Sequence, residues 1–376
     1  MRRSQIHFFW RDRSVGKRFR TGVSLHSHTL HSEESLAFIP RYTAGIPLVS
    51  DAIRHQARRY RAVTGRSLDF SRGFWRPPLA PREAYDLEKR QVREKVGVEA
   101  LVSLTDHDDI QAGSVLRVVE PHVPVSVEWT VPFGPTFFHI GVHNLPPQRA
   151  VALMPELAAF TAAPSKARLG ELLAALDELP EVLMAMNHPL WDEARIGTEE
   201  HAQLVGRFLE RFGERVHALE LNGMRSWREN RRVIWLAKHS GHTLVSGGDR
   251  HGLEPNANLN LTNARSFPEF VAEVRGDGIS EILFMPQYRE PLRVRMIETM
   301  RDAVRNYADL PVGRRRWSDR VFYKLNDGTV KPLSAYWHGD GPWPVKWFLG
   351  GLRAMTSQQV RTALCFALAD PQEARL

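Results

Sequence analysis

Two histidines near the start of the chain, His26 and His28, are separated by a single residue. Apolar Val23 and Leu25 alternate with Ser24 and with these two histidines, which is the period-2 pattern of a strand with one buried and one polar face. On such a strand both imidazoles point the same way, about 7 Å apart. Two imidazoles at that separation can share one metal ion or hold two adjacent ions. The pair alone is also what two ordinary polar strand residues would show, so a metal site requires further ligands elsewhere in the chain.

Other polar clusters follow short apolar runs in the same way. The run at 100–104 suits a strand that is buried on both faces, and the alternating segments at 123–128, 182–186, 216–221 and 243–246 also read as strands. A partner strand is expected at 136–143. The polar residues that come at or after the ends of these segments are Asp106, His107, Asp108, Glu128, His188, Asn222, Asp249 and His251.

Helical segments separate most of these strands, for example at 165–179, 198–212 and from Ser226 to Gly241. Strands that alternate with helices indicate βα units around a parallel sheet, and about seven of them favour a barrel over an open sheet. Barrel active sites are built at the C-terminal ends of the strands. We therefore expect the polar clusters to meet there.

The composition limits the ligand types and the class of protein. The chain has 376 residues, 43% of them hydrophobic, and can form one large α/β domain or two modest ones. Cys365 is the only cysteine, which excludes an intrachain disulfide and a thiolate metal cluster. Any metal must therefore bind histidine, aspartate and glutamate. No apolar run is long enough to span a bilayer and no signal-like segment is present, so we expect a cytoplasmic protein without membrane association.

The chain is basic, with 51 lysines and arginines against 43 acidic residues and a net charge of +8. Arginine suits phosphate recognition, so an anionic substrate or nucleic acid is a plausible partner, although such a charge is also common on solvated surfaces. Basic and aromatic residues gather in an N-terminal arm (1–20), an insert (about 35–97) and a C-terminal appendage (291–376). The appendage either stacks on nucleic acid or packs against the domain at 21–290.

In order and approximate spacing, the clusters around His26, His107, Glu128, His188 and Asp249 resemble those of the polymerase and histidinol phosphatase (PHP) superfamily, over about residues 22–290. The resemblance implies an α/β fold, a distorted (β/α)7 barrel of the PHP type, here with a long insert after the first strand and a C-terminal appendage. It also implies two or three divalent metal ions and hydrolysis of phosphate esters. Imidazole and carboxylate ligands suit zinc, manganese or iron.

The resemblance implies a set of metal ligands, with Glu128 as the bridging carboxylate and Asp106 orienting a neighbouring histidine. Glu33 stands where the family often has an aspartate, and His143 is a reserve for His139. Glu220 is expected to be structural or to face the substrate. The implied ligands are His26, His28, Glu33, His107, Glu128, His139, His188, Asp249 and His251.

The implied reaction is in-line attack on phosphorus by a metal-bridging hydroxide. Asp108 and His139 are the candidates for protonating the leaving group. The Gly-Arg that follows His-Pro in some members is Leu-Trp here, so we expect Arg250 or Arg195 to supply the phosphate-binding guanidinium. As catalytic residues we therefore name Asp108, His139 and Arg250.

The leading hypothesis is a metal-dependent phosphoesterase that acts on a small phosphorylated metabolite or a nucleotide. An alternative is a nuclease or a nucleic-acid-binding protein in which the basic segments hold the strand. Hydrolysis of another bond, such as an amide or a lactone, is a third interpretation.

Overall fold

The computed structural model of the chain describes residues 3–40, 47–337 and 341–369. The chain divides into two compact units. The larger unit consists of residues 1–32, 79–296 and 364–376, and the smaller unit of residues 33–78 and 297–363. Each unit therefore contains segments that are distant in the sequence.

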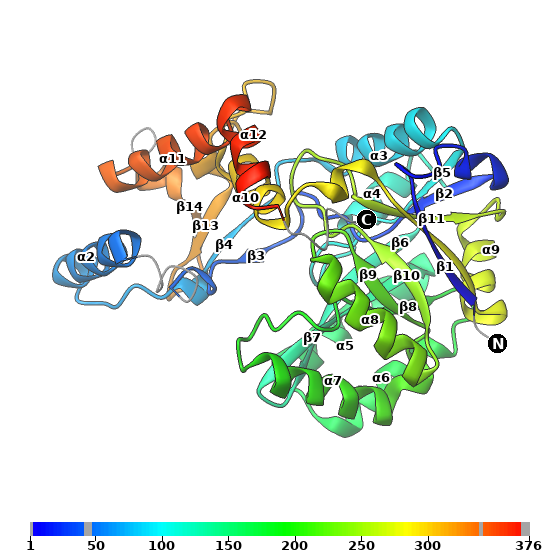
Figure 1. Ribbon diagram of the computed structural model, residues 1–376. Helices are drawn as coiled ribbons and strands as arrows, with labels where there is room; N and C mark the ends of the chain where they lie inside the picture. Colours follow the sequence, from blue (N-terminus) through cyan, green and yellow to red (C-terminus); the bar gives the residue numbers. More distant parts are fainter. Residues whose placement is uncertain (1–2, 41–46, 338–340, 370–376) are drawn as a thin grey trace. The chain divides into compact units, whose positions relative to one another are not determined.

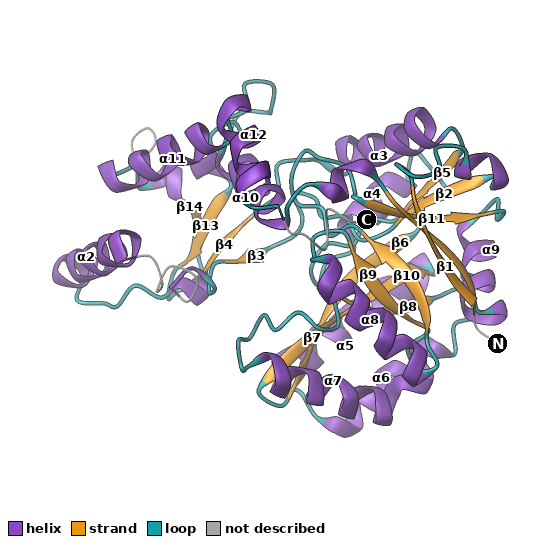
Figure 2. Ribbon diagram, in the orientation of Figure 1, coloured by secondary structure: helices purple, strands orange, loops and turns teal. Residues whose placement is uncertain are grey.

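The larger unit contains two five-stranded sheets (Figures 1 and 2). The first has the order β1 (Arg3–Phe8), β12 (Ile279–Phe284), β11 (Asn258–Thr262), β2 (Thr21–Ser24) and β5 (Glu99–Val102). The second has the order β10 (Thr243–Gly247), β9 (Ala218–Asn222), β8 (Leu183–Asn187), β7 (Thr136–Leu145) and β6 (Val125–Phe133). Strand β1 comes from the segment for which we expected an arm.

The expected (β/α)7 barrel is wrong, because the described strands form separate open sheets and none of these sheets closes on itself. The pairing is also mixed: β11 is antiparallel to both β12 and β2, and β7 is antiparallel to both β6 and β8. Hydrophobic alternation identifies a buried strand but not the direction of its neighbour, so the pattern suggested parallel units throughout. Two isolated parallel bridges link the sheets. Ser27, after β2, pairs with Arg250, after β10, and His107, after β5, pairs with Glu128 in β6.

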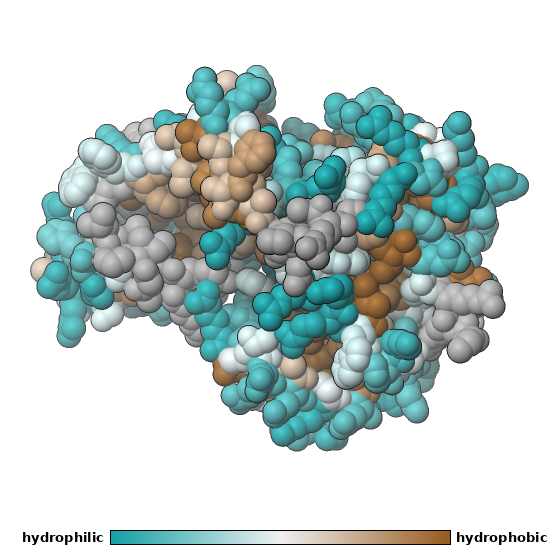
Figure 3. All heavy atoms as spheres, in the orientation of Figure 1, coloured by the Kyte–Doolittle hydropathy of each residue, from teal (hydrophilic) through white to brown (hydrophobic). Residues whose placement is uncertain are grey.

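Helices cover the second sheet and bury its apolar side chains. α5 (Pro147–Ala162) contacts β6, and α8 (Trp227–Ser240) contacts β9 and β10. α7 (Thr198–Phe212) buries Leu204, Phe208 and Phe212 but exposes its other side, where Figure 3 shows mostly hydrophilic residues. The other helices of this unit are α3 (Pro81–Arg90), α4 (Gln111–Arg117), α6 (Lys166–Asp177) and α9 (Phe267–Ala272).

The smaller unit is built on a four-stranded antiparallel sheet. Its order is β14 (Val330–Pro332), β13 (Val321–Lys324), β4 (Gly73–Trp75) and β3 (Glu34–Ser35). Its core includes Trp317, Val321 and Leu349, the last from α11 (Trp343–Met355). α2 (Pro47–Thr64) belongs to the same unit, while α10 (Leu292–Val304) and α12 (Gln358–Ala367) each contain residues of both units. Within the described part of the chain, no helix combines the length and the apolar character needed to cross a membrane.

A candidate metal centre

Eight of the nine predicted ligands lie within strands of the two large sheets or in the segments that follow these strands. His26 and His28 follow β2, His107 follows β5, His188 follows β8 directly, and Asp249 follows β10. Glu128 and His139 lie within β6 and β7. Because the segment that follows β5 pairs with β6 at the His107–Glu128 bridge, residues from the two sheets meet at one place.

The backbone at this place differs from the extended strand that the first motif suggested. β2 ends at Ser24, and His26 has a φ of 61° in the left-handed region. His188 and Asp249 also have positive φ values, 28° and 56°. Non-glycine residues rarely adopt this conformation, which costs on the order of 1–3 kcal/mol and persists where the surroundings enforce it. Here the amide of Asp249 donates to the carbonyl of His26 at 2.8 Å, which fixes the two turns against each other.

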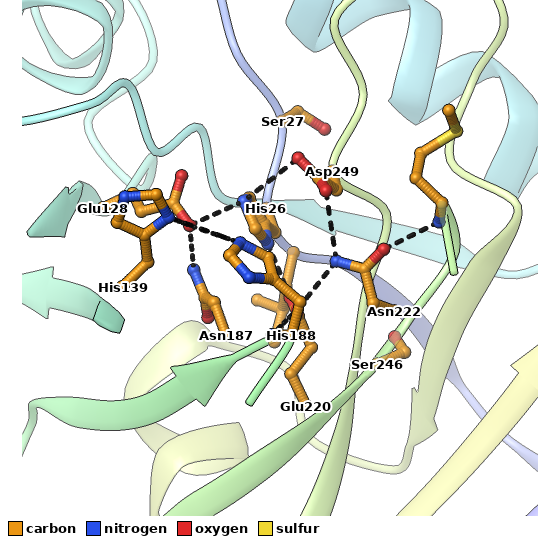
Figure 4. A network of polar contacts seen from close by, with 12 residues as sticks. His26, Ser27, Glu128, His139, Asn187, His188, Glu220, Asn222, Ser246 and Asp249 are labelled. Carbon is orange, nitrogen blue, oxygen red and sulfur yellow. Dashed lines mark hydrogen bonds and ion pairs between the residues drawn. The ribbon is translucent and has the colours of Figure 1, made fainter. Parts of the chain in front are cut away.

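Glu128 is the centre of the cluster and is fully buried. Figure 4 shows the imidazoles of His26, His139 and His188 close to its carboxylate. Five histidine nitrogens lie 3.1–3.5 Å from its carboxylate oxygens, and they belong to His26, His28, His107, His139 and His188. A carboxylate in an ordinary ion pair has one basic partner, whereas this carboxylate has five imidazoles around it. Asn187 donates a hydrogen bond to Oε1 at 2.8 Å and so fixes the rotation of the carboxylate.

The five imidazoles are divided between the two carboxylate oxygens. His26, His139 and His188 lie 3.1, 3.5 and 3.3 Å from Oε1. His28 and His107 lie 3.3 and 3.2 Å from Oε2. A carboxylate that presents each oxygen to a different set of nitrogen ligands has the arrangement of a bridge between two metal ions.

Asp249 and His251 complete the cluster on the side of the first motif. Asp249 Oδ1 lies 3.6 Å from His26 Nε2 and 3.7 Å from His28 Nε2. His251 Nδ1 lies 3.5 Å from the same oxygen, and its ring stacks on that of His28 with centroids 4.1 Å apart. Nitrogens of His28, His107 and His251 also lie within 4.8 Å of one another.

Two buried polar atoms in the cluster have the character of metal ligands. Within the described ranges of the chain, Nε2 of His26 and Oε2 of Glu128 are buried and make no hydrogen bond. A buried polar atom without a hydrogen bond costs about 1–3 kcal/mol unless something else satisfies it. Imidazole nitrogen and carboxylate oxygen are ligands for zinc, manganese and iron, so the donor set suits these ions.

Residues behind the ligands hold them in orientation. Glu220 lies with Oε1 2.6 Å from Nδ1 of His26, and its Oε2 accepts the backbone N–H of His188 at 2.7 Å. Asn222, two residues later on β9, donates to Glu220 at 2.8 Å. A carboxylate on the far nitrogen of a ligating histidine fixes the tautomer and the ring orientation. This contact gives Glu220 a defined supporting role.

The imidazoles and carboxylates of the cluster shift one another's pKa values. Burial opposes ionisation of Glu128, but the nearby imidazoles, His26 first, outweigh burial and hold the pKa of this carboxyl well below its ordinary value. Burial likewise disfavours the charged form of His26, yet Glu128, Glu220 and Asp249 together raise its pKa well above the ordinary value. A metal ion would compete with this proton, because it binds the neutral imidazole.

The structure brings together eight of the nine predicted ligands, Glu33 being the exception. Glu33 belongs to the smaller unit and forms an exposed ion pair with Arg76 at 2.6 Å. His143, the reserve for His139, lies 2.8 Å from Ser103 Oγ and does not belong to the ligand groups found among the described residues.

The other predicted site residues have structural contacts. Asp108 has a φ of 50° and accepts the backbone N–H of Thr130 at 2.8 Å, while burial raises the pKa of its carboxyl. Asp106 accepts hydrogen bonds from the hydroxyl and the backbone of Thr29. Arg250 does not take the expected phosphate-binding position, because its Nε binds buried Glu88 at 2.9 Å and its other nitrogens donate to backbone carbonyls. Its contacts hold together the loops that follow β2 and β10.

The sequence predicted no role for Asn222 or for Arg225, which both contact residues of the cluster. Glu220 and Asn222 alternate on β9 and therefore share one face of the strand, which is a signal that the sequence carries. Arg225 follows three residues later in the loop before α8, and its Nη2 lies 3.4 Å from Asp249 Oδ2. No motif distinguishes it from the other arginines.

Comparison with known proteins gives distant structural likenesses. No family model matches the chain, and no curated protein matches it. PsfC from Pseudomonas syringae is 15% identical with a TM-score of 0.42, over 75% of this chain and 97% of that one. A protein assigned as a metal-dependent phosphoesterase from Bifidobacterium adolescentis is 13% identical with a TM-score of 0.32, over 53% and 91% of the two chains. An amidohydrolase from Chromobacterium violaceum is 16% identical with a TM-score of 0.30, over 46% and 83%. At these values the likenesses do not assign the chain to a family.

Proposed function

We propose that the chain is a metal-dependent hydrolase that acts on phosphate esters, with a phosphorylated metabolite or a nucleotide as substrate. The observation that carries this proposal is the arrangement around Glu128, whose two oxygens face separate sets of imidazoles, all at 3.1–3.5 Å. A structural ion pair needs one partner for a buried carboxylate, whereas a bridge between metal ions needs ligands on both oxygens.

Two or three zinc, manganese or iron ions are the proposed cofactors. Glu128 would bridge two of them, with His26, His139 and His188 on one side and His28 and His107 on the other. Asp249 and His251 would add ligands on the side of His28. Bound divalent ions would make water nucleophilic at neutral pH and neutralise charge that develops on the phosphoryl oxygens.

The chain itself would hold this site rigid and largely dry. Glu128, His26 and His28 are fully buried, so the ligands are shielded from bulk water. Glu220 and Asn187 fix the orientations of His26 and Glu128 through contacts of 2.6 and 2.8 Å. Ligands that need little reorganisation favour catalysis, because the cost of ordering them is met during folding.

The order of the motifs along the chain supports a phosphate ester over an amide or a lactone. The motifs occur along this chain in the same order as in the phosphoesterase superfamily that they resemble: His-x-His, Thr-Asp-His, a strand glutamate, Asn-His-Pro and Asp-x-His. The imidazoles and carboxylates around Glu128 suit hydrolysis of either kind of bond, so the order of the motifs is what favours a phosphate ester.

The test measures release of p-nitrophenol or p-nitroaniline from p-nitrophenyl phosphate, bis(p-nitrophenyl) phosphate, p-nitrophenyl acetate and a p-nitroanilide, with Mn²⁺, Zn²⁺ or Fe²⁺. Nucleotides and a single-stranded oligonucleotide extend the panel. We expect the phosphate esters to be cleaved, with activity lost in His26→Ala and retained in His122→Ala, a control at an exposed histidine. Cleavage of the amide or acetate alone, or equal activity of His26→Ala, would contradict the proposal.

A further inference from the structure

Arg225 is a buried arginine at the edge of the metal centre whose contacts leave part of its guanidinium poorly satisfied. It lies in the loop between β9 and α8 and is only 9% exposed. Nη1 donates to the carbonyl of Met224 at 3.2 Å, and Nη2 donates to Asp249 Oδ2 at the long distance of 3.4 Å. Nε is buried, lies 3.9 Å from Glu229 Oε1 and makes no hydrogen bond with the residues that the structure describes.

Trp191 fixes the plane of this guanidinium. The guanidinium carbon lies 3.8 Å from the centroid of the indole ring, which is close stacking. Stacking covers one face of the guanidinium and leaves the N–H groups at its edge available for hydrogen bonds in the plane. A guanidinium held in this way can donate hydrogen bonds in its own plane to a tetrahedral anion or a carboxylate.

Trp191 contacts Arg225 and also lies close to candidate metal ligands. Trp191 follows His188 by three residues and lines a pocket together with His188, His139 and Glu193. Asp249, which Arg225 contacts through Oδ2, faces His26 and His28 through Oδ1. The guanidinium thus contacts one of the proposed metal ligands, Asp249, directly.

The arginines that the sequence suggested for this role do not occupy such a position. Arg250 is bound to Glu88 and to two backbone carbonyls, and Arg195 is exposed on the loop before α7. A buried guanidinium N–H without a hydrogen bond lowers the stability of the fold, and buried donors with a purely structural role normally have partners. A bound anion would supply them.

We propose that Arg225, held by Trp191, binds the phosphoryl group of the substrate beside the metal centre. This inference rests on the proposed function and names the residue of that site which recognises the anion. The long contact with Asp249 would then be shared with a phosphoryl oxygen, and Nε would donate to the same group. Arg225 would raise affinity for phosphate without being a metal ligand.

The experiment measures binding of inorganic phosphate to the Mn²⁺-loaded protein by isothermal titration calorimetry, for wild type, Arg225→Met, Trp191→Leu and Arg228→Ala. Arg228 is an exposed arginine on α8 and serves as the matched control. Loss of charge-assisted hydrogen bonds predicts phosphate binding weaker by about 10–100-fold in Arg225→Met. We expect a smaller loss in Trp191→Leu and none in Arg228→Ala.

Two further measurements exclude a merely structural role. The manganese content of Arg225→Met should equal that of wild type, and millimolar guanidinium should restore part of its phosphate binding. Unchanged phosphate affinity in Arg225→Met overturns the inference, and so does a loss of manganese that accounts for the weaker binding. If wild type hydrolyses no phosphate ester, the proposed function fails, while the comparison of phosphate affinities still decides the role of Arg225.

Discussion

The two compact units of the chain divide its charge unequally. The larger unit has 32 lysines and arginines against 33 acidic residues, and the smaller unit has 19 against 10, a net charge of +9. The larger unit also contains 14 of the 16 histidines. The candidate metal centre therefore belongs to a unit that is nearly neutral, and the basic character of the chain belongs to the other unit.

Burial differs between the units as well. In the larger unit Glu128, Glu88 and Arg250 are at most 4% exposed and contact one another or the ligands in continuous networks. In the smaller unit the arginines along α2 are exposed, as are Trp343 and Trp347 on α11, at 71% and 77%. The net charge of the whole chain therefore does not describe the environment of the site.

The largest effect is expected at the buried ion pair of Glu88 and Arg250 in the larger unit. Glu88→Leu leaves the Arg250 guanidinium buried without its carboxylate, which costs about 3–5 kcal/mol. Urea unfolding of metal-free protein, followed by circular dichroism, measures the loss. Asp86→Asn, at an exposed pair on the same helix, should unfold like wild type. Equal unfolding midpoints for Glu88→Leu and wild type would show that the network does not stabilise this unit.

Glu220 tests the support behind the ligands. In Glu220→Gln the neutral amide replaces the carboxylate on Nδ1 of His26, and such changes weaken metal binding by about 10–100-fold. Competition with a fluorescent chelator measures the affinity for Zn²⁺. Glu210→Gln, at an exposed position on α7, is the control and should bind like wild type. Affinity unchanged by Glu220→Gln would mean that His26 needs no second contact.

A substitution of His143 tests whether the interior of the larger unit keeps this imidazole uncharged. Burial lowers the pKa of His143 to about 3, against about 6.5 in an unfolded chain. The unfolded state therefore binds the proton first, and the contribution of His143 to stability is present above pH 6.5 and is lost as the pH falls toward 3. The slope contributed is at most about 1.4 kcal/mol per pH unit. Metal-free His143→Gln should show a shallower decline of stability between pH 6.5 and 4 than wild type; parallel curves would contradict a neutral, buried His143.

The smallest effect is expected on α2 of the smaller unit. Arg54 and Asp51 form an ion pair at 2.5 Å, but their side chains are 65% and 68% exposed. Exposed pairs of this kind contribute less than about 0.5 kcal/mol. Asp51→Ala should therefore leave the unfolding midpoint and the metal content within error of wild type. A large shift in either would remove the contrast between buried and exposed charges.

The sequence predicted which side chains converge better than it predicted the fold around them. Imidazoles and carboxylates next to apolar runs identified His26, His107, Glu128, His188 and Asp249, because buried strands deliver their following residues to the interior. The strand directions escaped prediction, since β7 and β11 pair antiparallel and alternation does not record direction. The positive φ of His26 also escaped, because tertiary hydrogen bonds enforce it.

Arginine roles were the least predictable part. Arg250 and Arg225 both follow strands of the second sheet, and nothing in their local sequence separates a cation bound to Glu88 from one stacked on Trp191. Their partners lie far away in the chain, so only tertiary structure distinguishes them. The same holds for Glu33, whose partner Arg76 is 43 residues away.

The most direct test of the account is the metal content of protein purified without chelator, measured by inductively coupled plasma mass spectrometry for wild type and Glu128→Gln. A carboxylate that bridges two ions predicts about two or more divalent ions per wild-type chain and a fall below one in the variant. Wild-type protein without bound metal, or a variant that keeps its full complement, would contradict the assignment of Glu128 as the centre of a metal site.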